Sequence, residues 1–552
     1  MASEIDSATD DAFASVSKWS DRGIACLVTL KKELDNVTSG SNYSNLRGDP
    51  GLRNRIKEKF CQFQRLSTTL DGIIDALNKG IDNLGRMCGI DLLPDEVLAA
   101  IFEMVVNTTG AITEHYVASC RWREAVSLSH INHRLRSIML ASPQLWTNMA
   151  SSRQMAAACL PRTNGLPLNI SMDADNHGRR DDWSFHPILA ELFPVAQYWE
   201  CLHLSISCMH PESRLGRNNF KFADLSDPPF YRLNAPLLEK LSIEYSCFVN
   251  GADTPHWDWS RWNTPNLRHL KTYRYFPISL PELISVTNLD LTMSIYDDHF
   301  PRTVKEISQM VNLRDFTVKF LDTDKFPRFI PMTEFPHIQQ LKMKTTRHAR
   351  NKGGKLADGW RPVFFSLFFP NLIHLQLDVE GKGCLSWGDE TFYFNEEMNR
   401  IFSQANQYPK VQSFYLKIVS QLDYDGECKV PTELAIPLNM LPSLKDLTIQ
   451  CNTRFDMVDD VESKEEVGDV LPILNTVTLD VLDASDVAKW LGEYLEEMKD
   501  RGKWDEFREL TIMERGGKDF QKTTYPRDKA LKWCKDMIIR REKPEGPFKH
   551  VS

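Results

Sequence analysis

The chain has 552 residues, enough for two or more domains, and its 42% hydrophobic and 26% charged residues are typical of a globular protein. Its 66 basic against 75 acidic residues give a net charge of −9, so no global positive field draws it to nucleic acid or acidic membranes. The start resembles no signal peptide, and no run of about 18 apolar residues occurs. We expect a soluble protein of the cytoplasm or nucleus.

Residues 1–51 predict one helix followed by a linker, because a loose helical pattern ends in the breaker run 38–42. Residues 52–90 predict one long helix with an apolar seam at alternating steps of four and three, which is typical of a coiled coil. The seam consists of Ile56, Phe60, Phe63, Ser67, Leu70, Ile74, Leu77, Ile81, Leu84 and Cys88. Gly72, Gly80 and Gly85 weaken it by up to about 1 kcal/mol each. A helix that makes a homodimer and a helix that folds back on its own chain explain the seam equally well.

Residues 91–150 predict a small helical unit. Its first helix carries an apolar stripe of Leu93, Val97, Leu98, Ile101, Phe102 and Val105. Pro94 suits the first turn, and Asp95 and Glu96 lie where the helix dipole favours acidic groups. After a polar insert at 107–123, a second stripe predicts another helix that ends at Ser142-Pro143. That stripe consists of Leu128, Ile131, Leu135, Ile138 and Met139, and Leu145-Trp146 follow it.

From residue 151 to 525 one phrase recurs, namely apolar-x-x-apolar-x-apolar, usually after Pro-x. It occurs at Leu238/Leu241/Ile243, Leu267/Leu270/Thr272, Val286/Leu289/Leu291, Leu313/Phe316/Val318, Ile338/Leu341/Met343, Leu372/Leu375/Leu377, Val411/Phe414/Leu416, Leu444/Leu447/Ile449 and Leu474/Val477/Leu479. Trp199/Leu202/Leu204 and Phe507/Leu510/Ile512 are plausible end members. Only Thr272 interrupts the apolar positions of the nine central phrases.

Each phrase predicts a short strand with one buried face. The residue between its last two apolar positions is polar in eight of the nine phrases, the exception being Tyr415. Connectors follow the strands, and 487–499 reads as a helix. Residues 526–552 predict a capping helix through Trp533, Met537 and Ile538, and then a tail.

Two resemblances follow from these motifs. Leu93-Pro94-Asp95-Glu96-Val97-Leu98, Ile131-Asn132-His133-Arg134-Leu135-Arg136 and Ser142-Pro143-Gln144-Leu145-Trp146 resemble an F-box of the large fungal families, although Asn132 and Leu135 depart from its usual Cys and Trp. The F-box resemblance implies docking on the Skp adaptor of a cullin-RING ubiquitin ligase. It assigns the adaptor contacts, or their support, to Leu93, Pro94, Val97, Leu98, Ile101, Phe102, Leu135, Pro143, Leu145 and Trp146. A helical hairpin that merely caps the next domain is the alternative.

The repeated phrases resemble the degenerate leucine-rich-repeat solenoids that follow F-boxes in many fungal proteins, and their spacing scatters about the 20–29 residue period of such repeats. The expected fold class is therefore α/β, with N-terminal helices, F-box helices and a repeat solenoid. Strands of ordinary sandwich domains are the alternative. The resemblance implies a concave sheet that binds a protein substrate, with Lys271, Lys342 and Tyr415 as candidate contacts. The tryptophan-rich run 256–262 adds Trp257 and Trp259, because Trp is favoured at binding hot spots; packing of an insert explains the run as well.

No motif for catalysis, nucleotide binding or metal binding is found, and we expect no cofactor and no enzyme. His130 and His133 lack a further ligand at metal-site spacing. The 12 cysteines include no C-x-x-C pair, so reduced thiols are expected. The leading hypothesis is a substrate-receptor subunit of a ubiquitin ligase. A non-catalytic scaffold with a decayed F-box that dimerises through 52–90 is the main alternative, and an enzyme with a site assembled across repeats is a weaker one.

Overall fold

The structure is a computed structural model of the chain. It divides into two compact units, Met1–Pro94 and Asp95–Ser552. The described residues are 93–108, 114–150, 152–175, 191–207, 232–245, 258–294, 299–321, 331–348, 364–382, most of 398–421, 432–452, 455–457, 471–514, 521–542 and isolated positions between 54 and 74.

The predicted N-terminal helix, 1–51, lies outside the described residues. Within the predicted coiled coil, 52–90, only isolated positions such as Cys61, Gly72 and Ile74 are described, and these are helical. The seam and the homodimer therefore stay predictions. The second unit is a mixed α/β body with a large, mainly parallel sheet. This confirms the predicted α/β fold class.

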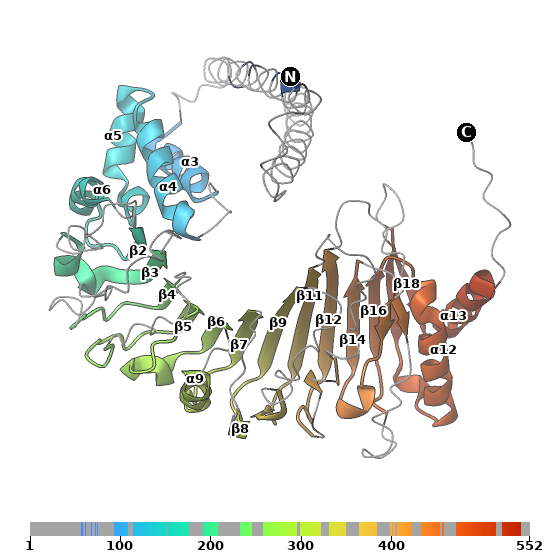
Figure 1. Cartoon of the computed structure of the whole chain (residues 1–552). Helices are drawn as coiled ribbons and strands as arrows, with labels where there is room; N and C mark the ends of the chain where they lie inside the picture. The colour runs from blue at the N-terminus through green and yellow to red at the C-terminus, as the bar shows by residue number, and fades with distance from the viewer. Residues whose placement is uncertain are drawn as a thin grey trace. The chain divides into compact units, whose positions relative to one another are not determined.

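A helical group opens the second unit (Figure 1). It consists of α3 (Asp95–Thr108), α4 (Glu114–Ser129), α5 (His133–Ala141), the 3-10 turn η3 (Pro143–Trp146) and α6 (Arg153–Cys159). The sequence predicted one helix for the stripe from Leu128 to Met139, and this prediction is wrong. The chain turns at 130–132, and Asn132 caps a new helix. The insert at 107–123 is also more regular than predicted, since α4 begins at Glu114.

Fourteen strands of the described residues form one large sheet and follow one another in it in chain order (Figure 1). Four further short strands form two separate two-stranded ladders. The fourteen strands are β1 (Asn148–Met149), β2 (Leu168–Asp175), β3 (Trp199–Ser207), β4 (Lys240–Tyr245), β5 (His269–Tyr273), β6 (Asn288–Ser294), β7 (Asp315–Leu321), β9 (Gln340–His348), β11 (His374–Lys382), β12 (Ser413–Gln421), β14 (Asp446–Cys451), β16 (Thr476–Val481), β17 (Glu509–Glu514) and β18 (Gln521–Pro526). The neighbours pair in parallel, except that β18 closes the sheet antiparallel to β17. The ladders join β8 (Thr333–Glu334) to β10 (Leu367–Phe368) and β13 (Thr432–Leu434) to β15 (Phe455–Met457).

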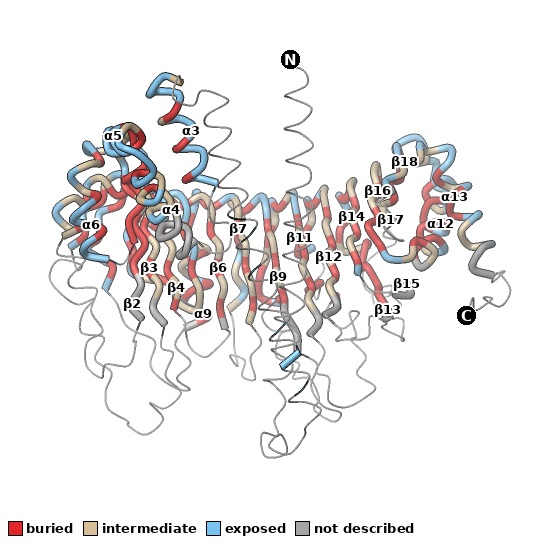
Figure 2. Tube along the Cα trace, turned by 90° about the horizontal axis from the view of Figure 1, so that it is seen from above, coloured by how far each residue is buried: buried red, intermediate tan, exposed pale blue. Residues whose placement is uncertain are grey.

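The recurring phrase marks the strands, as predicted. The last two apolar residues of every phrase lie in β3, β4, β5, β6, β7, β9, β11, β12, β14, β16 or β17. They align across the sheet, so that Leu241 pairs with Leu270 and Leu270 with Leu289. Buried and partly exposed residues alternate along the central strands, for example β4, β7 and β14 (Figure 2), which confirms the predicted single buried face there. β2, which the phrase search missed, joins the same register through Ile170 opposite Leu202.

Short connectors cover the apolar face. They include η4 (Leu160–Arg162), η5 (Phe193–Tyr198), η8 (Pro281–Ser285), α9 (His299–Ser308), η10 (Leu438–Met440), α12 (Ser485–Asp500) and η11 (Trp504–Glu506). Phe300 of α9 packs edge-on against Phe320 of β7, with ring centroids 6.4 Å apart. α12 confirms the helix predicted at 487–499, and α13 (Arg527–Glu542) confirms the capping helix.

The Pro-x turns before the strands carry two ladders of their own. In three successive turns the residue before proline is aromatic, and the rings of Phe335, Phe369 and Tyr408 stack at centroid distances of 5.1 and 5.9 Å. The residue after proline ties each turn to an earlier one: the Asn371 amide donates to the Pro336 carbonyl at 2.8 Å. Asn266 and Ser443, which also follow a proline, make the equivalent bond, and so does Asn312, although it follows Val311. These ladders hold neighbouring turns at one height and so fix the strand register.

Thr272 is the one polar residue among the apolar phrase positions, and its side chain is 1% exposed. Its hydroxyl has no hydrogen-bond partner among the described residues. A buried hydroxyl without a partner costs about 1–3 kcal/mol, so Thr272→Val, which keeps the shape, should stabilise the fold by about 1 kcal/mol. Slower hydrogen exchange of the β5 amides and a higher urea midpoint would show it. Thr448→Val, on the partly exposed face of β14, is the matched control and should change neither quantity. A loss of stability in Thr272→Val would contradict the prediction.

Candidate functional site

Helix α3 has two apolar faces. Leu98, Phe102 and Val106 are 2%, 7% and 1% exposed and face the interior of the helical group. Val97, Ile101, Met104 and Val105 are 43%, 37%, 63% and 41% exposed. Ile101, Met104 and Val105 follow Val97 by four, seven and eight positions, so all four lie along one side of the helix. We call them the α3 stripe.

The predicted adaptor residues therefore separate into two groups. Leu98, Phe102, Leu135, Leu145 and Trp146 are all buried within the chain itself. The Trp146 indole N–H donates to the Met139 carbonyl at 2.8 Å, which fastens η3 to the end of α5. These five side chains build the helical group and hold the α3 stripe in place.

The other predicted adaptor residues lie nearer the surface. Val97 and Ile101 belong to the α3 stripe, and Pro143 is partly exposed at the first position of η3. Leu93 and Pro94 directly precede α3, at the end of the first unit. The prediction did not include Met104, although it lies seven residues after Val97, a helical spacing that the sequence already contains.

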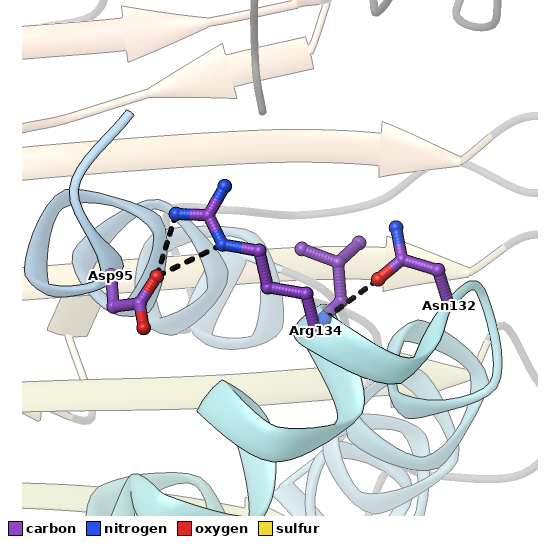
Figure 3. Close-up of polar contacts among 4 residues, drawn as sticks. Asp95, Asn132 and Arg134 are labelled. Atoms are coloured by element: carbon purple, nitrogen blue, oxygen red, sulfur yellow. Dashed lines mark hydrogen bonds and ion pairs between the residues drawn. The ribbon is translucent and has the colours of Figure 1, made fainter. Parts of the chain in front are cut away.

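A polar contact joins the first turns of α3 and α5 (Figure 3). One carboxylate oxygen of Asp95 accepts from Arg134 Nη2 at 2.6 Å and from Arg134 Nε at 3.0 Å. The Asn132 side chain accepts from the Leu135 backbone N–H at 2.8 Å and so caps α5. Asn is among the best N-cap residues, which gives a physical reason for Asn at this position. The ion pair is exposed, so we expect it to orient the helices more than stabilise them.

The helical group packs on the first strands of the sheet. α4 lies against β1 and β2, and Arg121 bonds both the Asn148 side chain at 3.4 Å and the Asn107 carbonyl at 3.3 Å. The guanidinium of Arg162 lies 5.5 Å from the centre of the Trp146 ring. Burial raises the pKa of the Cys159 thiol, on α6, to about 11, so this cysteine stays a neutral packing residue. The α3 stripe and the sheet thus belong to one packed body.

The second face of the sheet carries polar side chains in rows, and we call it the open face. The predicted contacts Lys271, Lys342 and Tyr415 all lie in the row that runs from His203 and Ser242 across to Thr511. His203 Nδ1 and Ser242 Oγ are 2.9 Å apart.

Several side chains of this face are already held by their neighbours. Lys342 Nζ lies 3.6 Å from Asp378 Oδ2, and Gln376 donates to the other oxygen of Asp378 at 2.9 Å. The Tyr415 hydroxyl bonds Gln450 Oε1, and Gln450 Nε2 donates to Asp480 at 2.7 Å. The open face therefore presents oriented polar groups rather than loose ones.

The prediction for Trp259 as a recognition residue is wrong. Trp259 is 2% exposed, packs edge-on against Trp262 at 4.4 Å, and donates its indole N–H to the Tyr275 hydroxyl at 2.7 Å. Buried tryptophans need such a partner, and this cluster joins the turn before β5 to the segment after it. Packing of the insert, the alternative considered above, explains this residue. Trp257 lies outside the described residues.

Within the part of the chain that is described, no group of three His, Cys, Asp or Glu side chains is placed to hold a metal ion. Among the same residues, no helix is both long and apolar enough to span a membrane. No family model and no curated protein matches the chain.

Loss of the α5 cap gives a direct test of the Asn132 geometry. Asn132→Ala removes the acceptor of the Leu135 amide and should cost about 1 kcal/mol, so the α5 amides should exchange about fivefold faster. Ser137→Ala, in the exposed middle of the same helix, is the control and should leave exchange unchanged or slower. Equal exchange in the two variants would show that Asn132 does not cap α5.

Proposed function

We propose that this protein is the substrate-receptor subunit of a Skp-cullin-F-box type ubiquitin ligase. In this proposal the helical group is an F-box that binds the Skp adaptor, and the sheet binds a protein substrate. The α3 stripe is the observation that carries the proposal, since it sets exposed apolar side chains on the helix that bears the F-box-like motif. Because no family model matches the chain, the proposal rests on these residues and the motif.

An exposed apolar stripe needs an explanation in physical terms. Burial of apolar surface contributes roughly 25 cal/mol per Å², and soluble proteins rarely leave adjacent large apolar side chains uncovered unless they bind a partner. Val97, Ile101, Met104 and Val105 are adjacent on α3 and are all more than a third exposed. The buried residues beneath them hold the helix in a fixed orientation. This arrangement suits docking of a preformed helix face against another subunit.

The sheet supports the finer prediction of a leucine-rich-repeat-like solenoid. Its strands follow one another in chain order, pair in parallel except at β18, and from β3 to β17 align one apolar pair per strand. A strand with its turn cannot bury its apolar face alone, so neighbours must stack. Such stacking leaves the open face available along many strands. We propose that the substrate binds there.

Function then follows from proximity. A receptor that holds a substrate beside a charged ubiquitin-conjugating enzyme raises the effective concentration of the substrate's lysines. This role needs binding surfaces on this chain and no reacting group from it. The packing of α4 on β1 and β2 matters here because it fixes the direction in which the open face points relative to the α3 stripe.

Charge placed in the α3 stripe should abolish adaptor binding. In the double variant Val97→Asp with Ile101→Asp, two carboxylates would have to be buried at the interface, and we expect capture of a purified Skp adaptor to weaken at least about 30-fold. Titration calorimetry with the full chain measures the affinity. Leu98→Ala with Phe102→Ala is a poorer test because both side chains are core residues.

The control for this test is Leu237→Asp, which adds a charge at another apolar residue of similar exposure, 42%, in a turn of the sheet. It should bind the adaptor as the unmodified chain does, and both variants should keep the thermal transition of the sheet. Undiminished adaptor binding by the double variant would refute the proposed interface. No adaptor binding by the unmodified chain would refute the function and favour the scaffold.

A further inference from the structure

We propose that Arg121 is a positioning residue that fixes the direction of the α3 stripe relative to the open face. It lies on α4, outside both surfaces, in the polar insert 107–123 to which the sequence assigned no role. Its assignment as a positioning residue rests on the geometry of the second unit alone. Its effect on ubiquitin transfer rests on the proposed function, because a proximity mechanism needs a fixed geometry between its two binding surfaces.

The Arg121 side chain bonds both α3 and the sheet. Its Nη2 donates to the backbone carbonyl of Asn107, the second-last residue of α3, at 3.3 Å. Its Nη1 donates to Asn148 Oδ1 on β1 at 3.4 Å. β1 is the first strand of the large sheet. One planar guanidinium therefore links the helix that carries the α3 stripe to the sheet that carries the open face.

On the helix side, Arg121 uses a carbonyl that the helix itself leaves free. The last carbonyls of a helix have no partner within it, and together they carry a partial negative charge that favours a cation. The last turn of α3 contains no basic residue, so Arg121 of α4 supplies the positive charge there. At the first turn, Arg134 of α5 bonds Asp95. Each end of α3 is thus held by an arginine of another helix.

On the sheet side, Arg121 bonds an amide whose position is fixed. Asn148 is 7% exposed and pairs with Asn169 in the parallel ladder of β1 and β2. Its Oδ1 also accepts from Asn169 Nδ2 at 3.4 Å. A buried amide oxygen that accepts from two donors has little freedom to turn. Arg121 therefore bonds a point that moves with the first two strands of the sheet.

A gain in stability does not explain Arg121. Both of its acceptors are neutral oxygens, and its Nε is buried without a hydrogen-bond partner among the described residues. Burial of a charged group with incomplete bonding costs free energy. The packing of α4 against α3 and against β1 and β2 already holds these parts together (Figure 1). Arg121 therefore adds direction to that packing, since a costly polar contact can select one arrangement over others.

The first test compares Arg121→Met with Arg123→Met in the full chain. Methionine keeps an unbranched side chain but lacks the donors, and Arg123 lies on the exposed side of the same helix, so its variant is the matched control. Pulsed electron paramagnetic resonance measures the distance between spin-labelled non-natural residues at Glu103 of α3 and Lys240 of β4, both exposed. Arg121→Met should make the distance distribution at least about twice as wide, and the control should not change it. Equal distributions would overturn the positioning role.

Thermal unfolding of the same samples separates positioning from ordinary stabilisation. Because Arg121 adds direction and not strength, Arg121→Met should keep the midpoint of the unmodified chain or raise it. A lower midpoint with an unchanged distance distribution would show a merely structural residue and overturn the proposal. If Arg121→Met does not fold, Arg121→Lys replaces it. Lysine keeps the charge but lacks the planar fork that bonds two oxygens together, so this variant should also widen the distribution.

The second test uses a reconstituted ligase in which the chain's own lysines accept ubiquitin. Both variants should bind the purified Skp adaptor as the unmodified chain does, because the α3 stripe is unchanged. Peptide mass spectrometry then gives the share of ubiquitin on each lysine, and the share on the most modified lysine should fall at least about twofold in Arg121→Met only. An unchanged pattern would overturn the effect on transfer. No adaptor binding by the unmodified chain would refute the proposed function, while the distance measurement would still decide the role of Arg121.

Discussion

The structure depends on the register of its parallel strands. One apolar pair per strand aligns with the next pair, as Leu270 does with Leu241 and Leu289, and the residue between them turns to the open face. A slip of one residue would exchange the two faces of a strand and expose its leucines. The stacked rings and the Asn371-type bonds of the Pro-x turns act against such a slip, because each ties one turn to another at a fixed height. Register therefore decides which side chains reach the open face.

The helical group shows the same principle on a helix. α3 carries apolar residues on both faces, and the tertiary packing of α5 and η3 selects Leu98, Phe102 and Val106 for the interior. The remaining face becomes the α3 stripe because nothing of comparable bulk from the described helical group covers it. A surface fit for docking thus arises as the complement of a well-packed interior, and the Asp95–Arg134 contact sets how the two helices meet.

Much of this fold could be predicted from the sequence, and the failures have physical causes. The strands were predictable because half-buried strands need strict alternation, which the phrases contain. β2 was missed because Pro167, just before the strand, stands at the first apolar position of the phrase, while Leu168, Ile170 and Met172 keep the alternation. The apolar spacing continues across Asn132 and therefore predicted one unbroken helix. The Asn132 side chain caps α5 instead, so a new helix begins there. Trp259 carries no sign in its own sequence of whether it is core or surface. The open-face row from His203 to Thr511 takes one residue from each strand, so only the register brings it together.

The position of the open face within the unit bears on how a proximity mechanism works. β1 contacts the helical group through α4, and β9 is the seventh strand after β1 in the sheet order. At about 4.8 Å per strand, the path along the sheet from the helical group to Lys344 is about 34 Å. Because every strand adds the same spacing between neighbours, the number of repeats sets this separation. No flexible linker contributes to this path along the sheet. A substrate held on the open face at β9 would therefore lie at a defined distance from whatever binds the α3 stripe, as efficient transfer to a nearby lysine requires.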